Sequence, residues 1–221
     1  GMDVLTHATE AYVSTLANDY TDGLCIQAVK MVFKYLERSY NNGSSDHEAR
    51  EKMHNASTLA GMAFANAFLG MNHSMAHKIG GEFHVPHGRA NAILLPFTIR
   101  YNGQKPQKLS TWPKYDHYDA DERYAELARA IGLKFNTVAE GVEAYAKAVG
   151  ELGRKVGIQM NFKSQGIDRD TWMNAMDKLS YLAYEDQCSP ANPRVPMVED
   201  MKKIMIAAYD TEEFMDKEEN K

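Results

Sequence analysis

Apolar residues recur at helical spacing along almost the whole chain, and no stretch alternates apolar and polar residues as a half-buried strand does. Near the N-terminus, for example, Val4, Ala8 and Ala11 lie three to four residues apart. We therefore predict an all-α fold. The predicted helices cover residues 3–17, 22–40, 45–69, 87–101, 119–131, 137–156, 169–184 and 196–209, with a further histidine-rich helix that breaks at Gly80 and Gly81.

Three segments carry more specific expectations. Residues 56–69 are small and apolar nearly all round, which is typical of a buried central helix. Residues 103–118, rich in proline and aromatic side chains, predict an irregular excursion between helices. Residues 210–221 form an acidic tail that we expect to be frayed, so residues 1–209 make up the predicted helical domain.

Composition excludes several classes of protein. The 221 residues carry a net charge of -5 with lysine and arginine scattered, which argues against a nucleic-acid partner. The two cysteines make neither a disulfide framework nor a paired metal motif, so we expect a reduced, cytoplasmic protein. No apolar run reaches the roughly 20 residues of a membrane span, and no signal peptide is recognisable.

Half of the chain's eight histidines lie within one short segment, and a carboxylate–histidine pair stands near the N-terminus. His73 and His77 are four residues apart, as are Asp3 and His7, so on helices each pair leaves one face. His87 precedes a glycine, where a ligand can approach closely. One carboxylate with three imidazoles suits Fe(II) or Zn(II) and leaves a position for substrate.

Simpler explanations remain open for some of these residues. Asp3 can be a first-turn acid that the helix dipole favours, and His7 can be a hydrogen-bonded core histidine. Met71 and Met75 are expected to pack rather than to bind metal. The other three histidines are expected to face solvent; they are His47, His54 and His117.

Other chemistries lack their motifs. The chain has no glycine-rich phosphate-binding turn and no G-x-S-x-G nucleophile turn. A metal-dependent hydrolase on an all-α scaffold remains the main alternative, although the phosphohydrolases of this kind need an adjacent His-Asp dipeptide. Here Asp46-His47 and Asp116-His117 have the reverse order.

These motifs resemble those of the iron-containing, or group III, alcohol dehydrogenases. The matching segments are Asp3-x-x-x-His7, His73-x-x-Ala76-His77-x-x-Gly80 and Pro86-His87-Gly88-x-Ala90-Asn91-Ala92. Residues 10–14, 64–70, 123–126 and 186–194 resemble the alcohol dehydrogenase half of the bifunctional aldehyde–alcohol dehydrogenases. The resemblance covers the chain up to its acidic tail, and it implies a dehydroquinate synthase-like α-domain, the C-terminal metal-binding part of that half.

The resemblance also implies residue roles. The iron ligands would be Asp3, His7, His73 and His87. His77 would lie near the nicotinamide and substrate and relay a proton, and Cys188 would belong to a loop that closes over the cleft. His84 receives no catalytic role, and Glu10 is one candidate for orienting a ligand histidine.

The implied reaction is the reversible, NADH-linked reduction of acetaldehyde or a similar short aldehyde, with the metal as Lewis acid. Fe(II) is the expected ion, and Zn(II) can substitute for it. In this family NAD(H) binds mainly to an N-terminal domain that we do not find here, so we expect a fragment that is inactive alone. The full-length protein would form a homo-oligomer or filament, and a filament-assembly role is the second alternative.

Overall fold

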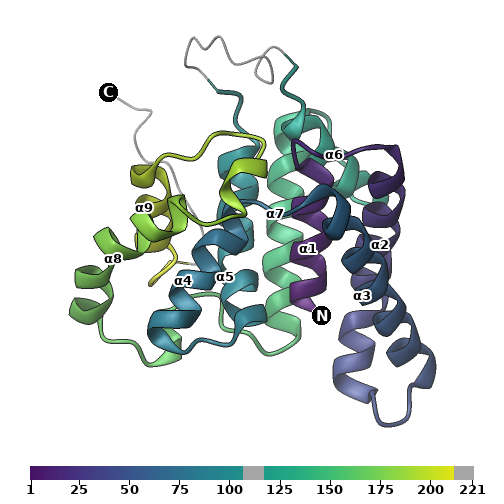
Figure 1. Cartoon of the computed structure of the whole chain (residues 1–221). Coiled ribbons are helices and arrows are strands. Elements are labelled where there is room, and N and C mark those ends of the chain that lie inside the picture. The colour runs from purple at the N-terminus through teal and green to yellow at the C-terminus, as the bar shows by residue number, and fades with distance from the viewer. Residues whose placement is uncertain (107–116, 212–221) are drawn as a thin grey trace.

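A computed structural model describes residues 1–106 and 117–211, and every regular element in these two ranges is a helix (Figure 1). The elements are α1 (Met2–Val13), α2 (Asp19–Asn42), α3 (His47–Ala67), α4 (Met71–Phe83), α5 (His87–Asn102), α6 (Ala120–Ala130), α7 (Val138–Lys155), η2 (Lys163–Gln165), α8 (Arg169–Tyr184), η3 (Ser189–Ala191) and α9 (Val198–Ala207). The predicted all-α fold is therefore confirmed. The predicted excursion at 103–118 and the acidic tail at 210–221 fall mainly outside the described residues.

Helix α5 is the centre of the fold, because every residue from Ala90 to Ile99 is buried. One of its sides contributes to a core shared with α1, α2, α3, α6 and α7. Its other side contributes to a second core with α4, α8 and α9, as the arrangement of the helices in Figure 1 illustrates. The apolar run with few charges thus forms a helix that is buried between the two cores.

The prediction that residues 56–69 form the buried central helix is wrong. Helix α3 lies at one edge of the molecule and buries only an alanine stripe, whose members are Ala49, Ala56, Ala60, Ala63 and Ala67. Its remaining side chains are exposed or only partly buried, and Met62 retains 53% of its accessible surface. Small residues allow close packing against α2 on one side, so their abundance does not require burial on all sides.

Several predicted boundaries also differ from the structure. Helix α1 ends at Val13, before the predicted end at residue 17, because Ser14 has an extended backbone (ψ 148°). Helix α2 begins earlier than expected because the Asn18 side chain accepts hydrogen bonds from the backbone N–H groups of Tyr20 and Thr21. Helix α4 continues through Gly80 and Gly81 instead of breaking there. A Cβ at Gly80 would lie 3.2 Å from a backbone oxygen of the following turn, so this glycine permits close packing and does not end the helix.

Removing the Asn18 cap should destabilise the fold measurably. Asn18→Ala leaves two first-turn N–H groups without their side-chain acceptor, and we expect the free energy of unfolding to fall by about 1 kcal/mol. Urea denaturation followed by circular dichroism measures the change. Asn55→Ala, at an exposed position within α3, is the control and should have little effect; equal losses in both variants would contradict the capping role.

None of the helices described here combines the length and the apolarity that a membrane crossing requires.

Candidate metal centre

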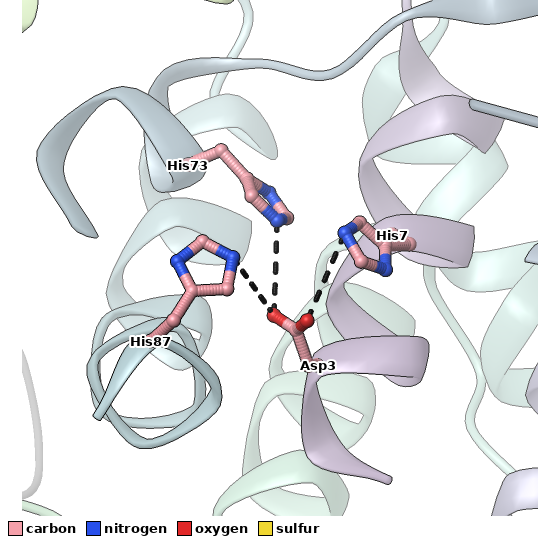
Figure 2. A group of neighbouring side chains, drawn as sticks. All are labelled: Asp3, His7, His73 and His87. Carbon is pink, nitrogen blue, oxygen red and sulfur yellow. Dashed lines mark ion pairs between the residues drawn. The ribbon is translucent and has the colours of Figure 1, made fainter. Parts of the chain in front are cut away.

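Four side chains from three helices converge on one point (Figure 2). Asp3 and His7 come from α1, His73 from α4, and His87 from the first turn of α5. Their candidate ligand atoms all lie within 4.8 Å of one another. We call these four residues the ligand cluster.

The ring nitrogens of the ligand cluster face its single carboxylate. Nε2 of His7 lies 3.8 Å from Oδ2 of Asp3 (Figure 2). The other carboxylate oxygen, Oδ1, lies 3.8 Å from Nε2 of His73 and 3.4 Å from Nε2 of His87. These separations exceed ordinary hydrogen-bond lengths, so the side chains surround a common centre rather than pair directly. Three imidazole nitrogens and a carboxylate oxygen are ligands that Fe(II) and Zn(II) accept.

Close contact between α1 and the start of α5 brings Asp3 and His87 together. A Cβ on Gly88 would lie 3.2 Å from Cβ of Asp3, so glycine permits this approach. Asn91, one turn after His87, donates its side-chain amide to Oδ1 of Asp3 at 2.8 Å. The same amide nitrogen lies 3.1 Å from Nε2 of His87. Asn91 therefore fixes the two side chains relative to each other.

Burial keeps two of the ligand imidazoles, those of His7 and His87, in the form that binds metal. Burial, together with the neighbouring His73 ring, lowers the pKa of His7 to about 4. Burial also lowers the pKa of His87, and the Asp3 carboxylate opposes this shift. Histidines with lowered pKa values are neutral at pH 7, and neutral imidazole is the ligand species.

His73 provides the clearest indication that the cluster suits an ion. Only 1% of its surface is exposed, and no described residue hydrogen-bonds to its Nε2 atom. A buried polar atom without a partner is unfavourable unless a ligand or ion satisfies it. The residues present therefore fit a divalent metal whose coordination would include this nitrogen.

Glu10 lies behind His73 and fixes the orientation of its ring. The Glu10 carboxylate is 2% exposed; its Oε2 atom pairs with Nδ1 of His73, and its Oε1 atom accepts the backbone N–H of Asn72 at 2.8 Å. A Cβ on Gly70 would lie 2.9 Å from Oε1, so this glycine makes room for the carboxylate. With Nδ1 engaged, Nε2 of His73 faces the cluster. Carboxylates behind metal-binding histidines commonly have this role.

His77 and Cys188 lie beside the ligand cluster, in one pocket. The pocket is lined by His7, Phe64, Ala65, Phe68, Leu69, His73, His77, His87, Gln187 and Cys188. The His77 ring stacks on the ring of His87 with centroids 5.5 Å apart. Burial and the nearby Asp186 charge together raise the pKa of the Cys188 thiol to about 12, so the thiol stays protonated.

The remaining predicted histidines lie elsewhere. His84 occupies a left-handed conformation (φ 55°) at the end of α4, is exposed and stands outside the cluster. The three histidines expected to face solvent do so; they are His47, His54 and His117. Met71 and Met75 are fully buried in the second core, as expected for packing residues.

Sequence reasoning missed several residues around the site. Asn91 could have been found, because it follows His87 at helical spacing and thus shares its face. Asp186 and Lys78 meet each other only through tertiary structure, with Nζ of Lys78 2.8 Å from Oδ2 of Asp186. Phe64 and Phe68 belong to the segment 64–70 that resembles the alcohol dehydrogenases, but the sequence did not show that they form an apolar wall of the pocket.

Comparison with known proteins gives a consistent result. The family model of the Fe-containing alcohol dehydrogenases, C-terminal, matches residues 1–209. An aldehyde-alcohol dehydrogenase of Streptococcus pneumoniae serotype 4 is 66% identical over 209 residues, which cover 95% of this chain and 23% of that protein. The chain thus spans about a quarter of the length of the first curated relatives it matches.

Solved structures share the fold. An alcohol dehydrogenase from Oenococcus oeni is 37% identical with a TM-score of 0.83, covering 94% of this chain and 50% of that one. A sulfoacetaldehyde reductase from Bifidobacterium kashiwanohense, solved in complex with NAD+, is 25% identical with a TM-score of 0.77, covering 95% of this chain and 49% of that one.

Proposed function

Since this chain belongs to the iron-containing alcohol dehydrogenase family and matches the C-terminal domain of that family, we propose that the ligand cluster holds one divalent iron ion. The unpartnered Nε2 atom of buried His73, facing Asp3, is the observation that carries this proposal. Zn(II) is the expected competitor, because nitrogen and oxygen ligands generally bind it more tightly than Fe(II).

The proposed reaction is the reversible reduction of a short aldehyde such as acetaldehyde to its alcohol, with NADH as the hydride donor. The ion, when bound, supplies Lewis-acid polarisation of the carbonyl oxygen. Phe64, Phe68 and Leu69 give the pocket an apolar wall that suits a short alkyl group. His77, partly exposed in the same pocket, exchanges a proton with the substrate oxygen.

Nucleotide binding is proposed to fall mainly on a separate domain. The sulfoacetaldehyde reductase that was solved with NAD+ is about twice as long as this chain. The matched region covers 95% of this chain but only 49% of the reductase. The chain itself has no glycine-rich dinucleotide-binding turn. We therefore propose that the substrate site lies between the helical domain and a nucleotide-binding domain, and that Cys188 lies at this cleft.

A chimera tests the proposed activity. Residues 1–209 replace the corresponding segment of the pneumococcal aldehyde-alcohol dehydrogenase, to which they are 66% identical. We expect the chimera to oxidise NADH with acetaldehyde at a rate comparable with the parent, and the 221-residue chain alone to show no such activity. A folded, iron-loaded chimera that lacks activity would contradict the proposal, as would a normal rate from the chain alone.

The sequence left two alternatives to a dehydrogenase. The relatives named above are dehydrogenases or reductases, so they lend no support to the metal-dependent hydrolase. Assembly into homo-oligomers or filaments stays a prediction, as does a cytoplasmic location. Sedimentation at rising protein concentration tests self-association of this chain.

A further inference from the structure

A buried carboxylate lies directly behind His77. Asp186 follows the end of α8, and its side chain is 6% exposed. Its Oδ2 atom lies 3.1 Å from Nδ1 of His77 and 2.8 Å from Nζ of Lys78. Its Oδ1 atom accepts the backbone N–H of Cys188 at 3.0 Å. Asp186 thus connects α4 with the segment that carries Cys188.

We propose that Asp186 is a positioning residue that holds neutral His77 as its Nδ1–H tautomer and leaves Nε2 available to exchange a proton with the substrate oxygen. This inference rests on the proposed function of the site, and it adds a residue to which no role was assigned from the sequence. Asp186 acts through His77 and lies behind it.

The groups around Asp186 determine which partner donates in the hydrogen bond between Asp186 and His77. Burial by itself would raise the pKa of Asp186, but hydrogen bonds from Lys78, from the Cys188 backbone and from His77 lower it to about 2. The carboxylate is therefore ionised at neutral pH and can only accept hydrogen bonds. Since it faces Nδ1 of His77, that nitrogen must carry the proton.

The second ring nitrogen of His77 is then the reactive one. No described residue hydrogen-bonds to Nε2, and the ring lines the pocket beside His73 and His87. In a neutral Nδ1–H ring, Nε2 carries a lone pair. The alternative Nε2–H tautomer would place an N–H where the alcohol proton must be accepted, and it would leave two lone pairs, on Nδ1 and Oδ2, facing each other.

The proton transfer balances without another reactant. In alcohol oxidation the substrate O–H bond breaks and an N–H bond forms at Nε2, which leaves a cationic ring protonated on both nitrogens. The Asp186 carboxylate stabilises this cation through Nδ1–H and stays ionised itself. In aldehyde reduction the same proton returns from Nε2 to the alkoxide, while the hydride comes from NADH.

Nitrogen-15 NMR of the histidine rings tests the proposal directly on the 221-residue chain. Long-range ¹H–¹⁵N spectra distinguish the two neutral tautomers, and the loss of one ring system in His77→Gln assigns the His77 signals. Spectra are recorded without metal at about pH 8, above the reference histidine pKa of about 6.5. We expect the Nδ1–H pattern in the unmodified chain.

Variants test whether the Asp186 carboxylate, and not another neighbouring charge, determines the tautomer of His77. Asp186→Ala should shift His77 towards the Nε2–H tautomer, which a free histidine side chain favours in water, while Lys78→Gln should retain Nδ1–H because Asp186 remains. Glu185→Gln, which removes the charge of an exposed neighbouring carboxylate that accepts from Tyr181, is the matched control and should change nothing.

The unmodified chain alone can overturn the proposal. An Nε2–H tautomer, or a ring protonated on both nitrogens, would contradict it even if every variant failed to fold. An unchanged Nδ1–H pattern in folded Asp186→Ala would also overturn it. These readouts are independent of metal loading and of dehydrogenase activity, so failure here and failure of the proposed function are distinguishable.

Discussion

Replacing His73 and His87 together by alanine is expected to reduce bound metal from about one ion per chain to none. The two substitutions remove the α4 and α5 contributions to the ligand cluster and leave only Asp3 and His7, which are neighbours on α1. Two side chains on one helix cannot surround an ion that prefers four protein ligands. Anaerobic loading with Fe(II), followed by desalting and elemental analysis, measures the bound metal.

The control is a second pair of histidine substitutions outside the cluster. His47→Ala with His54→Ala also removes two imidazoles, but both are exposed on α3. We expect this control to keep its metal, and circular dichroism should show that both double variants remain helical. Equal metal content in the unmodified chain and the His73/His87 double variant would contradict the proposed site, and so would loss of metal from the control.

The i, i+4 pairs of the site could be predicted from the sequence because they depend only on helix geometry. Asp3 with His7, and His73 with His77, need no knowledge of tertiary structure to be placed on one face. The meeting of α1, α4 and α5 is different. It depends on close backbone approach at Gly70 and Gly88, which the one-dimensional pattern does not reveal.

The same limit explains the wrongly assigned central helix. The alanine-rich second half of α3 and the middle of α5 are both apolar, and periodicity alone does not say which helix is covered on both sides. Asp186 was equally beyond prediction, because its contact with His77 spans a long separation in sequence. Local rules therefore predicted the helices and the two i, i+4 pairs, and they named Glu10 as one candidate for orienting a histidine. Which histidine each supporting carboxylate contacts became evident only in the folded chain.

Glu10→Gln is expected to weaken metal binding 10- to 100-fold, as losses of orienting carboxylates behind metal-bound histidines generally do. In the native chain the carboxylate accepts two hydrogen bonds, from Nδ1–H of His73 and from the backbone N–H of Asn72. A glutamine of nearly equal size has one oxygen and one donor-only nitrogen. If its oxygen faces Asn72, its nitrogen donates to Nδ1 of His73, which then carries its proton on Nε2 and cannot bind metal. The opposite orientation sets two donors against each other at Asn72.

Competition with a chelator for Zn(II) or Co(II) measures the dissociation constant of each variant. Glu126→Gln is the matched control, since Glu126 also accepts a side-chain hydrogen bond, from Tyr12, and lies outside the ligand cluster. We expect its metal affinity to be unchanged. A Glu10→Gln variant that stays folded and binds as tightly as the unmodified chain would show that the carboxylate only packs against His73. A loss confined to Glu10→Gln would show that the metal affinity depends on how the ring of this one buried histidine is held.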